Sequence, residues 1–153
     1  MRDAKSDGSE IGIQQWAEEA HQNAGHLAAM LGVARDLFEA DPLALLPGLQ
    51  NYASRLPLDQ FEQSDWITLH SDLTSFLGDV LVRRRGAAWV RGADPSSPTG
   101  YRYYLEVTGP DGVTRRVEPY DVVMEEFSNL PIEIARMIAN AEVTLGVSSY
   151  IDE

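Results

Sequence analysis

The chain has 153 residues, of which 44% are hydrophobic and 24% charged, and it contains no cysteine. This composition is typical of one globular domain and excludes wholesale disorder, a disulfide framework and any cysteine-based metal or redox site. No run approaches the roughly 18 apolar residues that a membrane span needs, and MRDAKSDGSE lacks the apolar region of a secretory signal. We therefore expect a cytoplasmic protein without a membrane partner, whose residues 1–10 form a disordered tail.

The net charge of −12 is distributed unevenly along the chain. Residues 1–82 carry 4 basic and 13 acidic side chains, residues 83–116 carry 7 and 3, and residues 117–153 carry 1 and 8. An acidic field repels nucleic acid and anionic membranes and favours a basic partner. Eleven of the twelve basic residues are arginines, which is typical of a high-GC bacterial genome.

The first half of the chain predicts helices. Apolar residues recur at three- and four-residue spacing over residues 12–39, which indicates one long amphipathic helix that ends before Asp41-Pro42. Two glycines on its apolar stripe, Gly25 and Gly32, would permit close helix packing. A second helical stretch covers residues 43–55, and Pro47 is expected to start a fresh turn within it.

A third helix has the clearest signals. Ser64 is its expected N-cap, three arginines occupy its last turn, and Gly86 suits the left-handed position after its end. Its apolar seam includes Trp66, Leu69, Leu73, Phe76, Leu77, Val80 and Leu81. The opposite face carries polar residues, and three of them are the aligned carboxylates Asp65, Asp72 and Asp79.

The period then changes from helical to alternating. Strands are predicted at residues 87–91, 101–108 and 113–118, and the last two are joined by Gly109-Pro110-Asp111-Gly112. Helical spacing returns from Pro119 to Phe127 and from Leu130 to Leu145, before Gly146. The expected fold class is α+β: N-terminal helices, a small antiparallel β-sheet of about three strands, and C-terminal helices. A single domain spans residues 11–146, followed by a flexible tail at 147–153.

Local motifs give no support for an enzyme. Glu18 and His21 have the i, i+3 spacing of a helical metal motif, but a second copy is missing, so a solvated face or a capped core histidine is the favoured interpretation. His70 and Asp72 are two residues apart on a helix and do not face each other. No nucleophile elbow or glycine-rich phosphate loop occurs in the sequence. We expect no catalytic residues, no metal and no cofactor.

The aromatic and basic residues of the sheet allow two interpretations. Arginines beside Trp89 and the tyrosines could bind an anion or single-stranded nucleic acid. Alternatively, Arg102 and Arg116 pair with Glu106 and Glu118 across the hairpin, which the overall acidity favours because it opposes nucleic-acid binding. All three tryptophans stand at positions expected to face the core.

Three short segments carry the one resemblance to a known family. Leu77-Gly78-Asp79-Val80-Leu81, Gly86-Ala87-Ala88-Trp89-Val90 and Val117-Glu118-Pro119 resemble a widespread bacterial family of uncharacterised domains with an LGDxL…GxxWV…VxP core. The match covers roughly residues 70–145. The resemblance implies a helix that leads into a small sheet, and it implies no catalytic residue because the family has no assigned activity.

Two functions are predicted from these observations. The first is a non-enzymatic protein-interaction module, such as an immunity protein that neutralises a basic toxin, with Asp65, Asp72 and Asp79 as its partner-binding residues. The alternative is a module that binds a small molecule or anion on the Tyr/Arg face of the sheet through Trp89, Tyr103 and Arg116. A homodimer is compatible with both.

Overall fold

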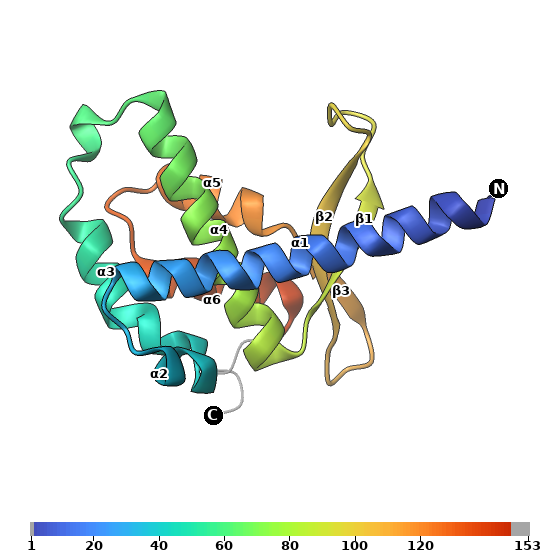
Figure 1. Cartoon of the computed structure of the whole chain (residues 1–153), viewed down its shortest axis with the longest axis horizontal. Coiled ribbons are helices and arrows are strands. Elements are labelled where there is room, and N and C mark those ends of the chain that lie inside the picture. Colours follow the sequence, from blue (N-terminus) through green and yellow to red (C-terminus); the bar gives the residue numbers. More distant parts are fainter. Residues whose placement is uncertain (1, 148–153) are drawn as a thin grey trace.

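The structure is a computed structural model that describes the backbone of residues 2–147 and the side chains of residues 12–147. It has the predicted α+β architecture, with helices before and after a three-stranded antiparallel sheet (Figure 1). The predicted C-terminal tail lies outside the described residues, except for Val147, which packs against the core. In chain order the elements are α1 (Arg2–Met30), α2 (Arg35–Ala40), η1 (Pro42–Leu45), α3 (Leu46–Ser54), η2 (Leu58–Gln60), α4 (Gln63–Arg85), β1 (Ala88–Ala93), β2 (Tyr101–Thr108), β3 (Thr114–Val117), α5 (Pro119–Phe127) and α6 (Ile134–Leu145).

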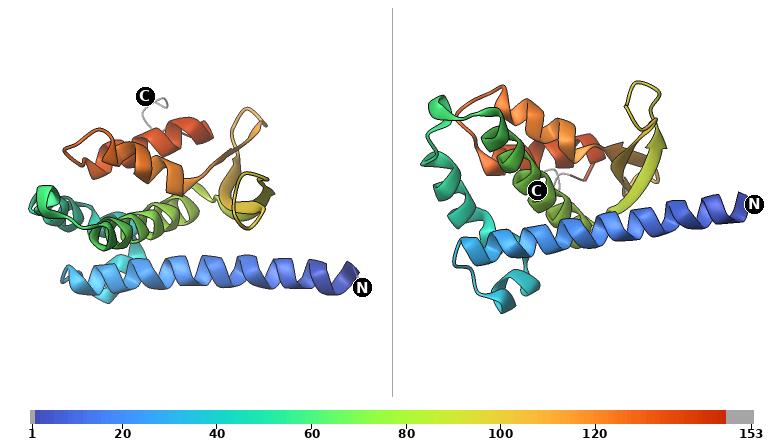
Figure 2. Two further views of the ribbon diagram at one scale, coloured as in Figure 1. Left: turned by 90° about the horizontal axis from the view of Figure 1, so that it is seen from above. Right: turned by 45° about the horizontal axis from the view of Figure 1, so that its top comes forward.

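The helices are arranged in layers around α4 (Figure 2). Seen from above, α1 lies on one side of α4, while α5 and α6 lie on the other. The second half of α4 is buried on nearly every side, from Ser75 to Leu81. This helix therefore forms the centre of the core and presents different side chains to α1, to the sheet and to α5.

The predicted single helix over residues 12–39 is wrong. α1 ends at Met30, Gly32 takes the left-handed conformation with φ +77°, and α2 begins at Arg35. The amide of Val33 donates to the carbonyl oxygen of Ala28 at 2.9 Å, which closes the end of α1. Gly32 thus stops the helix instead of helping it to pack. At its other end α1 begins at Arg2, across the segment expected to be a disordered tail, where no proline interrupts it.

Residues close in sequence determine where α4 begins and ends. Its N-cap is Glu62 and not the predicted Ser64, because the carboxylate of Asp65 accepts the backbone N–H of Glu62 at 2.9 Å. Gly86 ends the helix with φ +70°, and three arginines fill the last turn, so both predictions are confirmed. Pro47 stands in the first turn of α3, also as predicted.

The sheet has the order β1-β2-β3, and its register places Trp89 beside Leu105 and Leu105 beside Val117. These residues face the helices, and Leu105 is fully buried. The predicted ion pairs are present: Arg102 contacts Glu118 at 2.8 Å and Arg116 contacts Glu106 at 3.4 Å.

The last helix begins four residues later than predicted. Leu130 and Pro131 precede it in a loop, and α6 begins at Ile134, whose amide donates to the side-chain oxygen of Gln50 on α3 at 2.7 Å. The N-terminus of α6 is therefore capped by a residue 84 positions earlier in the chain, a contact that local spacing cannot reveal.

Candidate functional site

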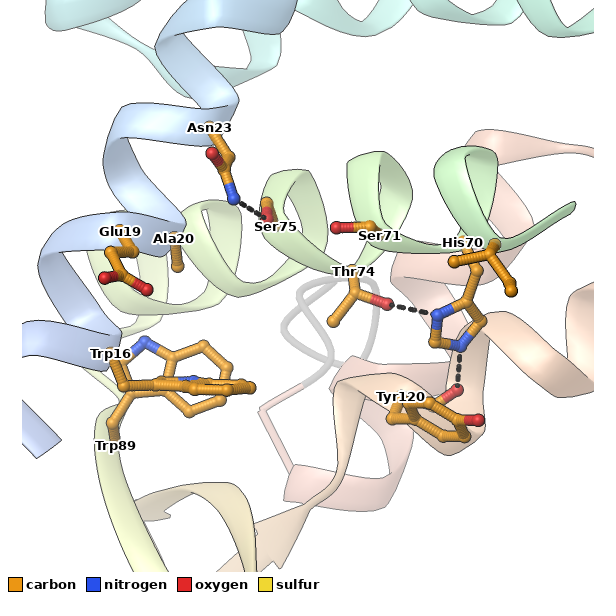
Figure 3. A pocket seen from close by; sticks show the side chains of 11 residues that line it. Trp16, Glu19, Ala20, Asn23, His70, Ser71, Thr74, Ser75, Trp89 and Tyr120 are labelled. Atoms are coloured by element: carbon orange, nitrogen blue, oxygen red, sulfur yellow. Dashed lines mark hydrogen bonds between the residues drawn. The ribbon is translucent and has the colours of Figure 1, made fainter. Parts of the chain in front are cut away.

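A valley runs along α4, with α1 and the sheet on one side and α5 on the other. Two cavities meet in it, and both are lined by Ile67, His70 and Tyr120. The larger one, the α4–α5 groove, has a volume of about 570 Å³ and is completed by Gln63, Trp66, Met124 and Phe127. The smaller one, the indole pocket, has a volume of about 380 Å³ and is completed by Trp16, Glu19, Ala20, Asn23, Ser71, Thr74, Ser75 and Trp89 (Figure 3).

The α4–α5 groove is apolar because both helices carry more apolar side chains than the core covers. Its floor is a chain of edge-to-face aromatic contacts, with the ring of Trp66 5.1 Å from Phe61 and 5.0 Å from Phe127. Above this floor Ile67 is 60% exposed and Met124 is 45% exposed. Water therefore contacts large apolar side chains on both walls, which is typical of a surface that binds another molecule.

The two helices that form this groove carry no basic residue where they line it. Residues 56–82 contain five Asp or Glu side chains, residues 117–135 contain five more, and neither segment contains a Lys or Arg. On α5, Asp121 is exposed next to Tyr120 and lies 3.6 Å from an Arg102 nitrogen, and Glu125 is exposed next to Met124.

Several of these carboxylates are already paired: Asp79 and Glu126 are buried in ion pairs with arginines, and Glu118 is paired with Arg102. The negative charge beside the groove therefore comes mainly from exposed carboxylates next in sequence to its lining residues, namely Glu62, Asp65 and Glu125.

His70 connects the two walls of the groove. Its Nε2 lies 3.1 Å from the carbonyl oxygen of Tyr120, which can only accept, so Nε2 carries the proton and donates it. The imidazole ring also packs edge-to-face on the Tyr120 ring at 4.1 Å. Burial lowers the pKa of His70 below its ordinary 6.5, and this outweighs the hydrogen bond to Tyr120 and the nearby Asp121. The neutral imidazole is therefore the form that this site favours.

The lowered pKa of His70 predicts a pH dependence of stability. Above about pH 6.5 the side chain is neutral in both the folded and the unfolded chain and has no effect; as the pH falls below 6.5, the unfolded chain binds the proton first. The free energy of unfolding should therefore decrease over this range until the pKa of the folded state is reached. Urea unfolding from pH 5 to pH 8 measures it.

His70→Gln provides the control, because a glutamine amide can donate to the same carbonyl oxygen and does not titrate. We expect the variant to lose part of the decrease below pH 6.5. Identical slopes for the two proteins would contradict the assignment.

The indole pocket is built from four elements that are distant in sequence, α1, α4, β1 and α5. Trp16 from α1 and Trp89 from β1 stand nearly perpendicular, with ring centroids 5.8 Å apart and an angle of 77° between them. Tyr103 stacks on Trp16 at 4.1 Å and covers one face of that indole. Both tryptophans were expected in the core, but Trp16 is 38% exposed and forms the wall of a cavity. The crossing of α1 over α4 and β1 was not visible in the sequence.

The three predicted partner-binding carboxylates have different surroundings. Asp79 is 4% exposed, and its carboxylate contacts His21 Nδ1 at 2.7 Å and an Arg83 nitrogen at 3.1 Å. Asp65 caps α4, and Asp72 is half-buried, with a pKa raised above 3.8 by that burial. Asp79 is therefore not available to a partner. The prediction treated the whole polar stripe of α4 as exposed, although α1 covers its second half.

The predicted ligand-binding residues are divided between the two faces of the sheet. Trp89 and Tyr103 line a small cavity of about 170 Å³ on the inner face. Arg116 stands opposite Glu106 on the outer face, where it packs over the ring of Tyr104 at 4.9 Å. The three residues therefore do not form one site. Arg102, which the prediction omitted, lines the inner cavity instead.

The described residues contain no group of three His, Asp or Glu side chains placed to hold a metal ion. His21, the possible ligand next to Glu18, points toward the carboxylates of Asp79 and Glu39. None of the helices in the described part of the chain is long and apolar enough to cross a membrane.

Comparison with known proteins gives no relative from which a role could be inferred. No protein-family model matches the chain, and no curated protein and no solved structure shows significant similarity to it. The resemblance over residues 70–145 stays a prediction.

Proposed function

We propose that the protein is a protein-binding module that accepts an amphipathic, basic helix of a partner protein in the α4–α5 groove. The observation that carries the proposal is the combination of exposed apolar side chains on both walls with exposed carboxylates beside them and no Lys or Arg among the lining residues. A helix in an apolar groove is a recurrent mode of protein recognition, and its apolar stripe supplies most of the affinity. An immunity protein that binds a basic toxin in a bacterial cytoplasm would be one example.

The shape of the groove supports a helical occupant. Tyr120, Met124 and Phe127 follow one another at i, i+4 and i+7 along α5, so they present a ridge about two turns long. Trp66, Ile67 and His70 form the opposite wall. Apolar side chains of a partner helix at the same spacing could pack between these walls, with Ile67 and Met124 as the most exposed contacts.

Charge decides between possible occupants. A second copy of this chain would bring another acidic surface to an acidic border, because the whole protein has a net charge of −12. A basic helix would instead place Lys or Arg near the exposed carboxylates of Asp65 and Glu125, which speeds association and selects the partner. The groove thus favours a different, basic protein over a homodimer.

The alternative function, anion or small-molecule binding on the Tyr/Arg face, receives less support. Arg116 is engaged by Glu106 and by the Tyr104 ring, and Arg102 is engaged by Asp94 at 2.6 Å and by Glu118. An anion would have to displace these carboxylates before it could bind.

The proposal predicts selective binding of a defined probe. Two helical peptides with the same leucine stripe, one with lysines and one with glutamates on the other face, are titrated calorimetrically. We expect the lysine peptide to bind at least tenfold more tightly than the glutamate peptide. Ile67→Ser should weaken binding of the lysine peptide by about tenfold, because Ile67 is proposed as a central anchor, and the few anchor positions of an interface each cost more than about 1 kcal/mol of binding energy on truncation.

Val143→Ser is the matched control, because Val143 is 59% exposed on α6 and does not line the valley. The control should bind like the wild type. Equal affinity for both peptides, or unchanged affinity after Ile67→Ser, would refute the proposal.

A further inference from the structure

The indole pocket has aromatic walls that meet at a corner. The nearly perpendicular indoles of Trp16 and Trp89 form two of its sides, and the ring of Tyr120 lines the cavity as well (Figure 3). Tyr103 occupies one face of Trp16, so the part of this indole that lines the cavity belongs to its other face and its edge. Aromatic faces carry negative potential, and several of them around one cavity attract a cation.

The polar side chains of the pocket also favour a cation. Glu19 is the one charged group of fixed sign among the lining residues, and Figure 3 shows its carboxylate on the same side of the cavity as the Trp16 indole. No Lys or Arg lines the pocket. His70 is neutral here because burial lowers its pKa, and its one N–H is donated to the Tyr120 carbonyl oxygen. The pocket therefore carries a negative charge that no cation within it balances.

The size of the cavity limits what can enter. About 380 Å³ lies near the lower end of the ~300–1,000 Å³ range of small-ligand sites. The indoles provide apolar surface and Glu19 provides charge, so the fitting group is a cation with an apolar surface. A bare metal ion does not suit this lining, because hard cations require several oxygen ligands and only one carboxylate is present.

We propose that the indole pocket binds an organic cation, an alkylated ammonium group that lies against Trp16 and Trp89 and is neutralised by Glu19. The same chemistry occurs in free choline-like molecules and in methylated lysine side chains of proteins. The proposal stands independently of the α4–α5 groove, because its residues Trp16, Glu19 and Trp89 do not line that groove.

Titration with choline tests the proposal. Choline is compared with 3,3-dimethylbutan-1-ol, its neutral isostere, while NMR follows the three indole N–H signals. We expect saturable shifts for Trp16 and Trp89 but not for Trp66, which lies in the α4–α5 groove. Choline should bind about tenfold more tightly than the alcohol, as expected when a cation contacts several aromatic rings beside a carboxylate. Equal binding of the two compounds, or shifts without saturation, would overturn the proposal.

Matched variants separate charge from folding. Glu19→Gln removes the charge from an exposed side chain and should weaken the binding of choline severalfold. Glu18 is next to Glu19 on α1 but lies outside the pocket, so Glu18→Gln should leave the binding of choline unchanged. Equal effects of the two variants would contradict the assignment of Glu19. A peptide with trimethyl-lysine is titrated in parallel. Tighter binding of the peptide than of choline identifies a protein side chain as the source of the cation, and tighter binding of choline identifies a free molecule.

Discussion

Replacing Asp79 by alanine should lower the free energy of unfolding by about 3 kcal/mol, at the lower end of the cost of breaking a buried ion pair. The Asp79 carboxylate is almost fully buried and accepts from both His21 and Arg83, which also contacts the backbone of α2. Its removal leaves Arg83 and His21 without their shared partner between α1, α2 and α4. The cost stays moderate because these two side chains retain some contact with water. Urea unfolding at pH 7 measures the difference.

Asp72→Ala is the appropriate control, since Asp72 lies two turns earlier on the same stripe of α4. It has no hydrogen bond or ion pair among the described residues, and burial alone raises its pKa. Removing an unpaired, half-buried carboxylate should leave stability unchanged or increase it slightly. If both alanine variants changed the stability by the same amount, the ion-pair account of Asp79 would be wrong.

The second large effect is expected for Gly78→Ala. A Cβ at this position would lie 2.7 Å from the six-membered ring of Trp89, which is closer than packed atoms approach. The change gains about 1 kcal/mol of helix propensity. However, it forces a packed indole to move, and overpacking costs about 1–3 kcal/mol. The cost of the clash should exceed the gain in helix propensity. We therefore expect a net loss of stability together with a shift of the Trp89 indole N–H signal in the NMR spectrum.

Gly25→Ala separates these two contributions. At Gly25, also within a helix, the nearest atom to an added Cβ is a carbon of Phe38 at 3.7 Å, an ordinary contact. This variant should keep the gain in helix propensity and become up to about 1 kcal/mol more stable. Thermal unfolding of both variants shows whether their effects have opposite sign; stabilisation by both would contradict the close packing of Gly78 on Trp89.

Features with local signals in the sequence were predicted correctly. The αL glycine after α4, the extent of β2 and the start of α5 at Pro119 each depend on residues within one turn or one strand. The end of α1 was missed because Gly32 was assigned to helix packing, and the start of α6 was missed because a residue distant in sequence determines it. Gly32 reverses the chain after α1, and Gln50, distant in sequence, caps α6.

The candidate site was harder to predict because it exists only where distant elements meet. Asp79 looked like an exposed carboxylate, but His21, 58 residues earlier, covers and binds it. Met124 and Tyr120 fitted the apolar seam of a helix, yet the structure leaves them half exposed opposite Ile67. Periodicity indicates which face of a helix is apolar. It does not show how much of that face another helix covers.

Photo-crosslinking in the native cell tests the central claim, that the α4–α5 groove binds a basic protein, most directly. A benzophenone amino acid replaces Met124, and in a control protein it replaces Val143 on α6. We expect light to link the Met124 protein, and not the control, to another protein through a basic helical segment with an apolar stripe. Equal cross-linking from both positions, no cross-link from Met124, or a link to an acidic segment would contradict the account.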